Sequence, residues 1–304
     1  MRKYIGESAL LINTLIWGAT FVIIKSALSD ISPMMFVGIR FSFAALVLLP
    51  FSKKIFQISK PGIIQAGIGL GILYFLGFAT QTIGLQFTTA TKSGFITGTF
   101  VIFTPVFQLL LEKKVPDRWN IIGVIIVIIG LLFLSSKGES VFDVFNELGS
   151  NFNVGDFFTL LCAFFWGWYL VRLDMVSKKY DFMPLVFWQI LISGVGGFLF
   201  VFVFSVTGLE QIELTLNSNL IFAVLYTAIL ATVLATSLQT KYQKFVSPTK
   251  AGIILSFEPI FAALTAFFVL SEKISYFGII GCLLIFSGLI MSEVFAGGKN
   301  NNER

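Results

Sequence analysis

Two charged residues lie deep inside long apolar stretches of this sequence. Glu258 lies deep inside the stretch 247–270, and Arg40 is about seven residues inside the stretch 33–51. A charge at that depth in a membrane is costly, so such residues usually face a cavity or a partner. Glu258 is therefore a candidate for proton coupling or cation binding, and the alternative is a structural ion pair with Arg40. The chain has no histidine, so a proton relay would have to use a carboxylate such as Glu258.

Another candidate is a lysine at the head of an apolar run, TTATKSGFITGTFVIFTP, residues 88–105. Lys92 stands where a helix would begin, and a cation there could attract an anionic group such as a substrate carboxylate. The alternative is a lysine that snorkels and marks the edge of the membrane.

Polar and aromatic side chains inside the other apolar stretches are candidates for contact with a solute. Trp17 and Trp166 are each followed by glycine and lie midway along their stretches, away from the interface that tryptophan usually prefers. Close helix packing and hydrogen bonds between helices are the alternative roles for these side chains. The candidate substrate-binding residues are Asn13, Trp17, Tyr74, Gln81, Lys92, Thr97, Trp166, Trp168, Tyr226 and Ser256.

The stretches that position these residues recur along the whole chain. Of the 304 residues, 56% are hydrophobic and only 12% are charged, which is too little polar material to cover a soluble globule. A helix needs about 20 apolar residues to cross a membrane, and the stretches lack the alternating pattern of barrel strands. We predict an all-α integral membrane protein with ten transmembrane helices, at residues 8–28, 33–51, 62–85, 89–111, 119–136, 155–174, 183–206, 217–239, 247–270 and 276–295.

Lysine and arginine are distributed unevenly between the two sets of connecting segments. With the N-terminus inside, the cytoplasmic segments hold 16 of these residues and the outer segments hold four. The positive-inside rule therefore predicts that both ends of the chain are cytoplasmic. The net charge of +5 follows from this topology and gives no reason to expect a nucleic-acid partner. Cys162 and Cys282 both lie in apolar stretches without the companions of a metal site, so no metal, cofactor or disulfide is expected.

The chain contains an internal repeat. A shift of 158 residues keeps one register across two predicted helices, and it aligns Thr91 with Thr249, Lys92 with Lys250, Gly94 with Gly252, Gly123 with Gly281 and Gly130 with Gly288. At a slightly different shift, Trp17-Gly18 aligns with Trp166-Gly167. The predicted repeats are residues 8–136 and 155–295, joined by an extracytoplasmic linker, 137–154, and followed by a disordered tail, 296–304. Five helices per repeat is an odd number, so the second repeat enters the membrane from the opposite side, as in secondary transporters.

Several short motifs, in this order, resemble the EamA-type group of the drug/metabolite transporter superfamily. They are the two Trp-Gly pairs, the segment QTIGLQFTTATKSGFITG (81–98), the pair Glu258-Pro259, and the pairs Glu112-Lys113 and Glu272-Lys273. The resemblance covers essentially the whole chain. It implies a ten-helix basket whose central cavity is lined by helices one, three, four, six, eight and nine. It also implies export of amino acids, other metabolites or drugs.

The prolines depart from the repeat. At the shift of 158 residues, Pro105 falls opposite Ala263 and Pro259 falls opposite Val101. Because a proline inside a membrane helix frees a carbonyl group and can bend the helix, the bends of the fourth and ninth helices need not be equivalent.

These features together predict the class of protein. We expect a monomeric, multi-pass secondary transporter of the cytoplasmic membrane, in contact with lipid, that exports a small amphipathic metabolite such as an amino acid by alternating access. A passive channel, a facilitator or an exchanger is the main alternative. An intramembrane enzyme is less favoured, because the sequence has no histidine, no paired intramembrane aspartates and no GxSxG motif. The phosphate-binding loop of an ATP-driven pump is absent as well.

Overall fold

The computed structural model describes residues 2–56, 60–135, 152–271 and 275–297. The regular secondary structure in these residues is helical, apart from one isolated bridge between Ile31 and Leu214. Eight helical spans are long and apolar enough to cross a membrane, and two further apolar helices are shorter. The predicted linker 137–154 and tail 296–304 fall mostly outside the described residues, as do Glu272 and Lys273.

The first part of the chain forms helices that correspond to the first five predicted spans. They are α1 (Arg2–Ala27), α2 (Pro33–Leu48) with its extensions η1 (Leu49–Phe51) and α3 (Ser52–Ile55), α4 (Ile63–Phe87), α5 (Ala90–Gly98), α6 (Phe100–Phe107), the π-helical η2 (Gln108–Glu112) and α7 (Arg118–Ser135).

The second part forms a similar series. It consists of α9 (Val154–Ser177), α10 (Phe182–Thr207), α11 (Ser218–Leu225), the π-helical η3 (Tyr226–Leu234), α12 (Ala235–Tyr242), η4 (Gln243–Phe245), α13 (Pro248–Leu255), α14 (Glu258–Leu270) and α15 (Tyr276–Gly297).

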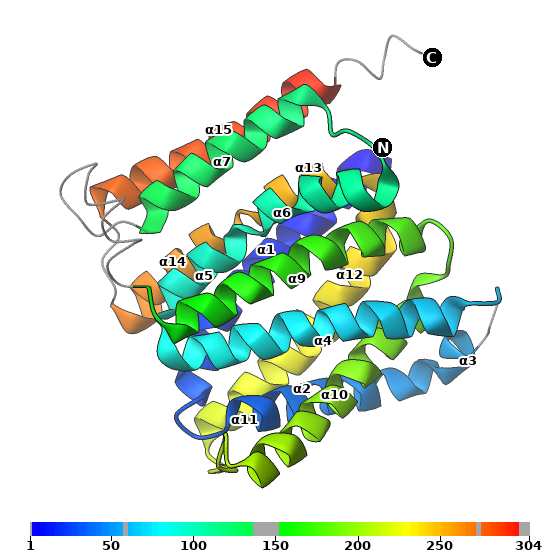
Figure 1. Ribbon diagram of the computed structural model, residues 1–304, viewed down its shortest axis with the longest axis vertical. Helices are drawn as coiled ribbons and strands as arrows, with labels where there is room; N and C mark the ends of the chain where they lie inside the picture. Colours follow the sequence, from blue (N-terminus) through cyan, green and yellow to red (C-terminus); the bar gives the residue numbers. More distant parts are fainter. Residues whose placement is uncertain (1, 57–59, 136–151, 272–274, 298–304) are drawn as a thin grey trace.

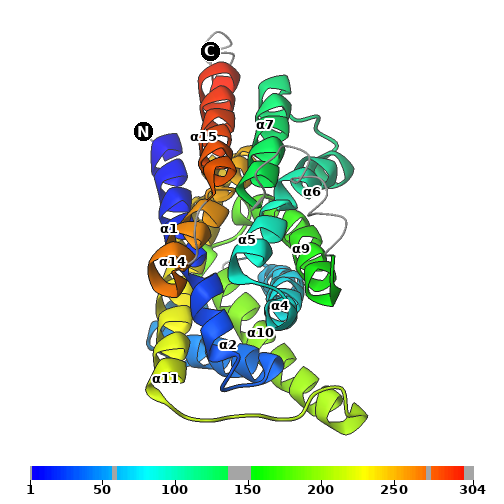
Figure 2. The same ribbon diagram turned by 90° about the vertical axis from the view of Figure 1, so that its left-hand side faces the viewer.

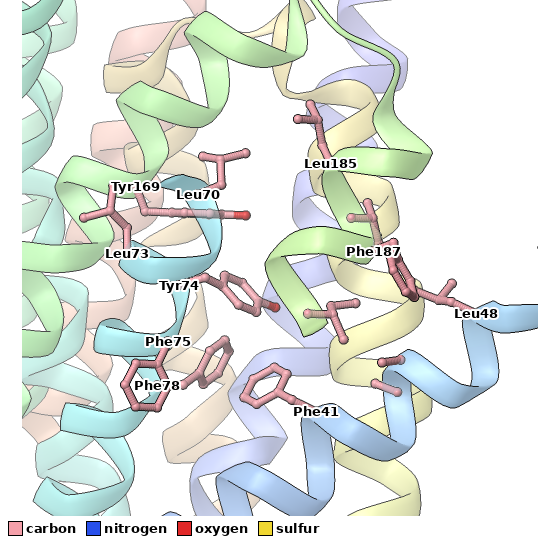
Figure 3. Packing of buried hydrophobic residues seen from close by; sticks show 14 of the residues in the cluster. Phe41, Leu48, Leu70, Leu73, Tyr74, Phe75, Phe78, Tyr169, Leu185 and Phe187 are labelled. Atoms are coloured by element: carbon pink, nitrogen blue, oxygen red, sulfur yellow. The ribbon is translucent and has the colours of Figure 1, made fainter. Parts of the chain in front are cut away.

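The helices form an elongated bundle with different neighbours at its two edges. Helices α7 and α15 lie side by side at one edge, and α2, α10 and α11 lie at the other (Figures 1 and 2). Between the edges, α4 packs against α9 and α1 packs against α14. A large aromatic cluster joins α2, α4 and α9, where Tyr74 contacts Phe41, Phe78 and Tyr169 (Figure 3).

Glycines that the repeat aligns meet one another in crossed pairs. Gly123 of α7 packs against Gly288 of α15, and Gly130 of α7 packs against Gly281 of α15. The two helices therefore run antiparallel at close approach, with backbone against backbone. Close packing of this kind is what small residues permit between helices in a membrane.

The glycines of the two Trp-Gly pairs make the same kind of crossed contact. Gly18 of α1 packs against Phe261 of α14, and Gly167 of α9 packs against Phe103 of α6. The shift of 158 residues aligns Phe103 with Phe261. In each part of the chain, the glycine of the Trp-Gly pair therefore packs against an aligned phenylalanine in a helix of the other part.

The fourth and ninth spans are both interrupted, and at equivalent positions. Helix α5 gives way to α6 at Thr99, and α13 gives way to α14 at Ser256 and Phe257, which is the aligned position. At Thr99 and Ser256 the backbone ψ angles are −6° and 0°, far from the α-helical value. Pro259 follows the second break and has no N–H to donate to Leu255, which explains the interruption there. The breaks therefore coincide although the prolines do not.

We expect Gly18→Ala and Gly167→Ala each to lower the free energy of unfolding by about 1–3 kcal/mol, because the added methyl group would overlap Phe261 or Phe103. Gly69→Ala is the matched control, since a methyl group there would meet no atom within 4 Å. Thermal unfolding in detergent, followed by tryptophan fluorescence, measures the effect. Equal midpoints for all three variants would contradict the close packing described above.

Candidate functional site

A narrow cavity lies inside the bundle, between the two parts of the chain. It has room for about one or two water molecules, so a larger solute requires the surrounding helices to separate. Its walls come from the first, third, fourth, sixth, eighth and ninth spans, the same six that the family resemblance implies. The lining residues are Trp17, Thr20, Phe78, Gln81, Thr97, Phe100, Trp166, Leu170, Gln239, Leu255 and Glu258.

Most of this lining consists of residues that the repeat aligns. The aligned pairs are Trp17 with Trp166, Gln81 with Gln239, Thr97 with Leu255, and Phe100 with Glu258. The tryptophan pair follows the shift of the Trp-Gly motifs, and the other three pairs follow the shift of 158 residues. The described lining is therefore nearly symmetric in position, with identical residues in two of the four pairs, and Glu258 introduces a carboxylate where the aligned residue is Phe100.

Glu258 is the first residue of α14, directly after the break in the ninth span. Its side chain is 8% exposed. In the part of the chain that the structure describes, it makes no ion pair and no side-chain hydrogen bond. A carboxylate at this position gains from the positive end of the helix dipole, but it otherwise faces the cavity without a partner.

Arg40 does not pair with Glu258, so the suggested ion pair is not formed in this structure. The Arg40 Nε donates a hydrogen bond to Thr232 Oγ1 at 3.0 Å, and the guanidinium lies over the rings of Phe41 and Phe78. Its Nη2 has no hydrogen-bond partner. Arg40 does not line the cavity, whereas the Phe78 ring that it contacts does. The aromatic faces and the Thr232 hydroxyl replace a carboxylate as the partners of this cation.

Lys92 and its repeat partner Lys250 both form ion pairs between the two parts of the chain. The Lys92 Nζ lies 2.7 Å from Asp156 Oδ2, and the Lys250 Nζ lies 2.7 Å from Glu7 Oε1. Asp156 and Glu7 are themselves aligned by the shift of the Trp-Gly motifs. The beginnings of α5 and α9 lie at one end of the bundle and those of α1 and α13 at the other, so the two pairs are at opposite ends (Figure 1). Lys92 thus has a protein partner and does not line the cavity.

The two ion pairs differ in their burial and in the hydrogen bonds around them. Asp156 is fully buried, accepts a hydrogen bond from Thr88 Oγ1 at 2.8 Å, and caps α9 reciprocally with Asn153. The side chains of Glu7 and Lys250 are 13% and 9% exposed.

Three other predicted residues hold α1 against the π-helical segment η3 and its end. Trp17 Nε1 donates a hydrogen bond to the carbonyl of Ala231, and Asn13 Nδ2 donates one to that of Ala235. Tyr226 donates from its hydroxyl to the carbonyl of Ile16 at 3.1 Å. A π-helical turn displaces carbonyl groups from regular bonding, and such turns are frequent at functional sites. Of these three residues, Trp17 also lines the cavity.

The remaining predicted residues divide between the cavity and its surroundings. Gln81, Thr97 and Trp166 line the cavity. Tyr74 is buried beside it and shares a hydrogen bond with Thr236 at 2.5 Å. Trp168 stacks on Phe107, and Ser256 donates to the carbonyl of Gly252, both away from the lining.

Sequence reasoning missed several lining residues, and Gln239 is the most informative of them. The shift of 158 residues that aligns the lysines also aligns Gln81-Thr82 with Gln239-Thr240, a match that would have identified it. Gln239 is 1% exposed, and its Oε1 has no hydrogen-bond partner. Thr20, Phe78, Phe100, Leu170 and Leu255 were missed as well, since nothing in their type distinguishes them from packing residues.

Apolar spans around a narrow internal cavity with a buried carboxylate are typical of a multi-pass membrane protein that handles a small molecule. The chain belongs to the EamA-like transporter family, which matches residues 4–136 and 153–293. This confirms the resemblance seen in the motifs, and the family and the names of the relatives indicate a membrane transporter rather than an enzyme.

Individual relatives agree with this assignment. An "Uncharacterized transporter" of Archaeoglobus fulgidus is 34% identical over 96% of this chain and 86% of its own length. A "Probable amino-acid metabolite efflux pump" of Salmonella typhimurium is 24% identical over 96% of this chain and 95% of its own length. A crystal structure superposes with a TM-score of 0.73, covering 98% of this chain and 99% of that one, at 16% identity, which supports the fold.

We expect Lys92→Met to destabilise the protein by about 2 kcal/mol, because it leaves the buried Asp156 carboxylate without its cation. Adding Asp156→Asn should cost less in this background than in the wild type, as expected for a coupled pair. Lys114→Met, at an exposed lysine, is the control. Unfolding midpoints of the four proteins give the coupling energy, and strictly additive effects would show that the pair is not coupled.

Proposed function

We propose that this protein is a secondary transporter that exports a small amphipathic metabolite, such as an amino acid, by alternating access. The observation that carries the proposal is the narrow cavity between the two parts of the chain, whose described lining contains one buried carboxylate without an ion-pair partner. The solute occupies an opened form of this cavity, and Glu258 couples its movement to a proton or cation. The ten-helix topology with both ends cytoplasmic, and the monomeric state, belong to this proposal.

The crossed contacts support an inverted repeat. Equivalent residues of the two parts meet in reverse order along α7 and α15, and the two Trp-Gly glycines each seat a helix of the other part. Such contacts arise when two similar units are related by a twofold axis that passes between them. In transporters with inverted repeats, the substrate site lies on that axis, near the middle of the membrane.

The two ion pairs are well placed to act as closures of the cavity. Each joins the first helix of one part to an interrupted span of the other, and they lie at opposite ends of the bundle. Alternating access requires one end to open while the other stays closed. Both pairs are formed in this structure, and the cavity between them is narrow.

A facilitator or exchanger would use the same cavity without a gradient, and this is the second candidate function. Coupling of solute movement to a proton or cation gradient distinguishes the proposed transporter from a facilitator or exchanger. Glu258 is the residue on which the distinction rests, because it is the charge in the described lining.

We expect a labelled amino-acid panel to accumulate in proteoliposomes when a pH gradient is imposed, and Glu258→Gln to abolish the gradient-driven component. The substitution keeps the size of the side chain but removes its charge and its ability to exchange a proton. Uptake with and without the gradient, in wild type and variant, is the measurement. Equal, gradient-independent flux in both proteins would favour the facilitator or exchanger and give Glu258 a structural role.

We also expect the two ion pairs to control access from opposite sides. In a variant with Cys162 and Cys282 replaced by alanine, Leu255→Cys supplies a thiol in the cavity wall. Lys92→Met should raise its labelling by an impermeant thiol reagent from one side of the membrane, and Glu7→Gln from the other. Vesicles of both orientations provide the test, with Lys114→Met as the control. Increases on the same side for both variants would rule out opposed closures.

A further inference from the structure

Three hydrogen-bond donors of the cavity wall already have acceptors within the protein. Trp17 Nε1 is bonded to Ala231, and the Thr20 hydroxyl is bonded to the carbonyl of Trp17 at 2.6 Å. Gln81 Nε2 points at Thr97 Oγ1, 3.5 Å away. These donors are therefore committed to protein acceptors before any solute arrives.

Two hydrogen-bond acceptors of the cavity wall, in contrast, have no such partner in the described chain. Gln239 Oε1 has no partner although the residue is 1% exposed, and the Glu258 carboxylate makes no ion pair and no side-chain hydrogen bond within the described chain. Buried polar groups normally have partners, and an unpartnered one needs an explanation. Two free acceptors in one cavity wall call for a ligand that brings hydrogen-bond donors.

The rest of the described lining favours positive charge as well. Four aromatic side chains, Trp17, Phe78, Phe100 and Trp166, share the wall with Glu258, and no lysine or arginine is among the described lining residues. Aromatic faces attract organic cations and fit apolar groups. A solute carboxylate would find no cation in this wall and would lie near Glu258, where like charges repel.

Arg40 does not change this balance. Its guanidinium lies against Phe78 and Phe41 and outside the lining, so a solute carboxylate in the cavity does not meet it. The repeat leads to the same conclusion, because Glu258 replaces the phenylalanine found at the aligned position 100. The fold does not need a charge at this point, since the equivalent wall position is apolar.

We propose that the cavity selects amphipathic organic amines, bound as cations to Glu258 and Gln239 between the aromatic rings, over zwitterionic amino acids of the same side chain. The proposal deepens the proposed transport function and rests on it. It names the ammonium group as the recognised part of the solute, and it makes zwitterionic amino acids weaker ligands because their carboxylate meets no cation in the described wall.

Matched ligands test it on the full-length protein in detergent, with tryptophan fluorescence as the binding signal. The series is phenylalanine, phenylalanine amide, phenethylamine and N-acetylphenylalanine, which vary the charged groups around one aromatic ring. We expect the amine and the amide to bind at least tenfold more tightly than phenylalanine, and N-acetylphenylalanine not to bind. Tighter binding of the zwitterion, or no binding of either cation, would overturn the proposal.

Variants assign the roles of the two acceptors. Glu258→Gln should weaken phenethylamine and its trimethylammonium analogue alike by at least tenfold, because both lose the charge partner. Gln239→Leu should weaken phenethylamine several-fold and leave the trimethylammonium analogue unchanged, since a quaternary ammonium has no N–H to donate. Glu213→Gln, at an exposed carboxylate, is the control with the same change in net charge. Equal losses for both ligands in Gln239→Leu would contradict the assigned hydrogen bond.

The outcomes separate this inference from the proposed function. Gradient-driven transport of zwitterionic amino acids but not of the amines, in the same proteoliposomes, would overturn the amine selectivity and leave the transporter intact. Amine binding without coupled transport would support the amine selectivity and overturn the proposed coupled transport.

Discussion

The cost of a charge in an interior without water governs how this protein is built. A carboxylate or ammonium group buried there needs a partner of opposite charge or several hydrogen bonds. Lys92 with Asp156, and Lys250 with Glu7, meet this demand as ion pairs, while Arg40 meets it with a hydroxyl and two aromatic faces. Glu258 is the buried charge in the described chain to which the protein supplies no such partner. A group left in that condition at the wall of a cavity is explained most simply by something that enters the cavity.

Near-symmetry gives the two ends of the bundle comparable closures. The ion pairs are related by the repeat, and so are the glycine contacts that seat α1 on α14 and α9 on α6. In the alternating access that we propose, opening one end while closing the other would exchange contacts of one kind for contacts of the same kind, so the two states would differ little in free energy. The surroundings of the two pairs are not identical, because Asp156 also accepts a hydrogen bond from Thr88 and caps α9 together with Asn153.

Sequence patterns were sufficient for the class of protein, and they predict the register of the repeat. Length and hydropathy define the spans whatever their neighbours, and paired glycines and lysines define the repeat. The site was less accessible, because lining a cavity and packing against a helix require the same residue types. Tyr74 and Trp168 look like ligand-binding residues in the sequence but use their polar or aromatic groups within the protein. Gln239 could have been found through its alignment with Gln81, whereas the aromatic partners of Arg40 depend on distances that no linear pattern contains.

The break in the ninth span connects the charge to the motion. Pro259 ends the hydrogen bonding of α13 and starts α14, which makes Glu258 the first residue of a half-helix. The helix dipole there favours the ionised carboxylate. The position at the start of α14 therefore partly compensates for the lack of an ion-pair partner. A backbone interruption is also the place where a span can bend at little cost, since no continuous hydrogen-bond ladder has to be broken. In the transport that we propose, a cation that binds Glu258 would act on the segment whose bending changes the size of the cavity, and this residue would link recognition of the solute to the movement of the helices.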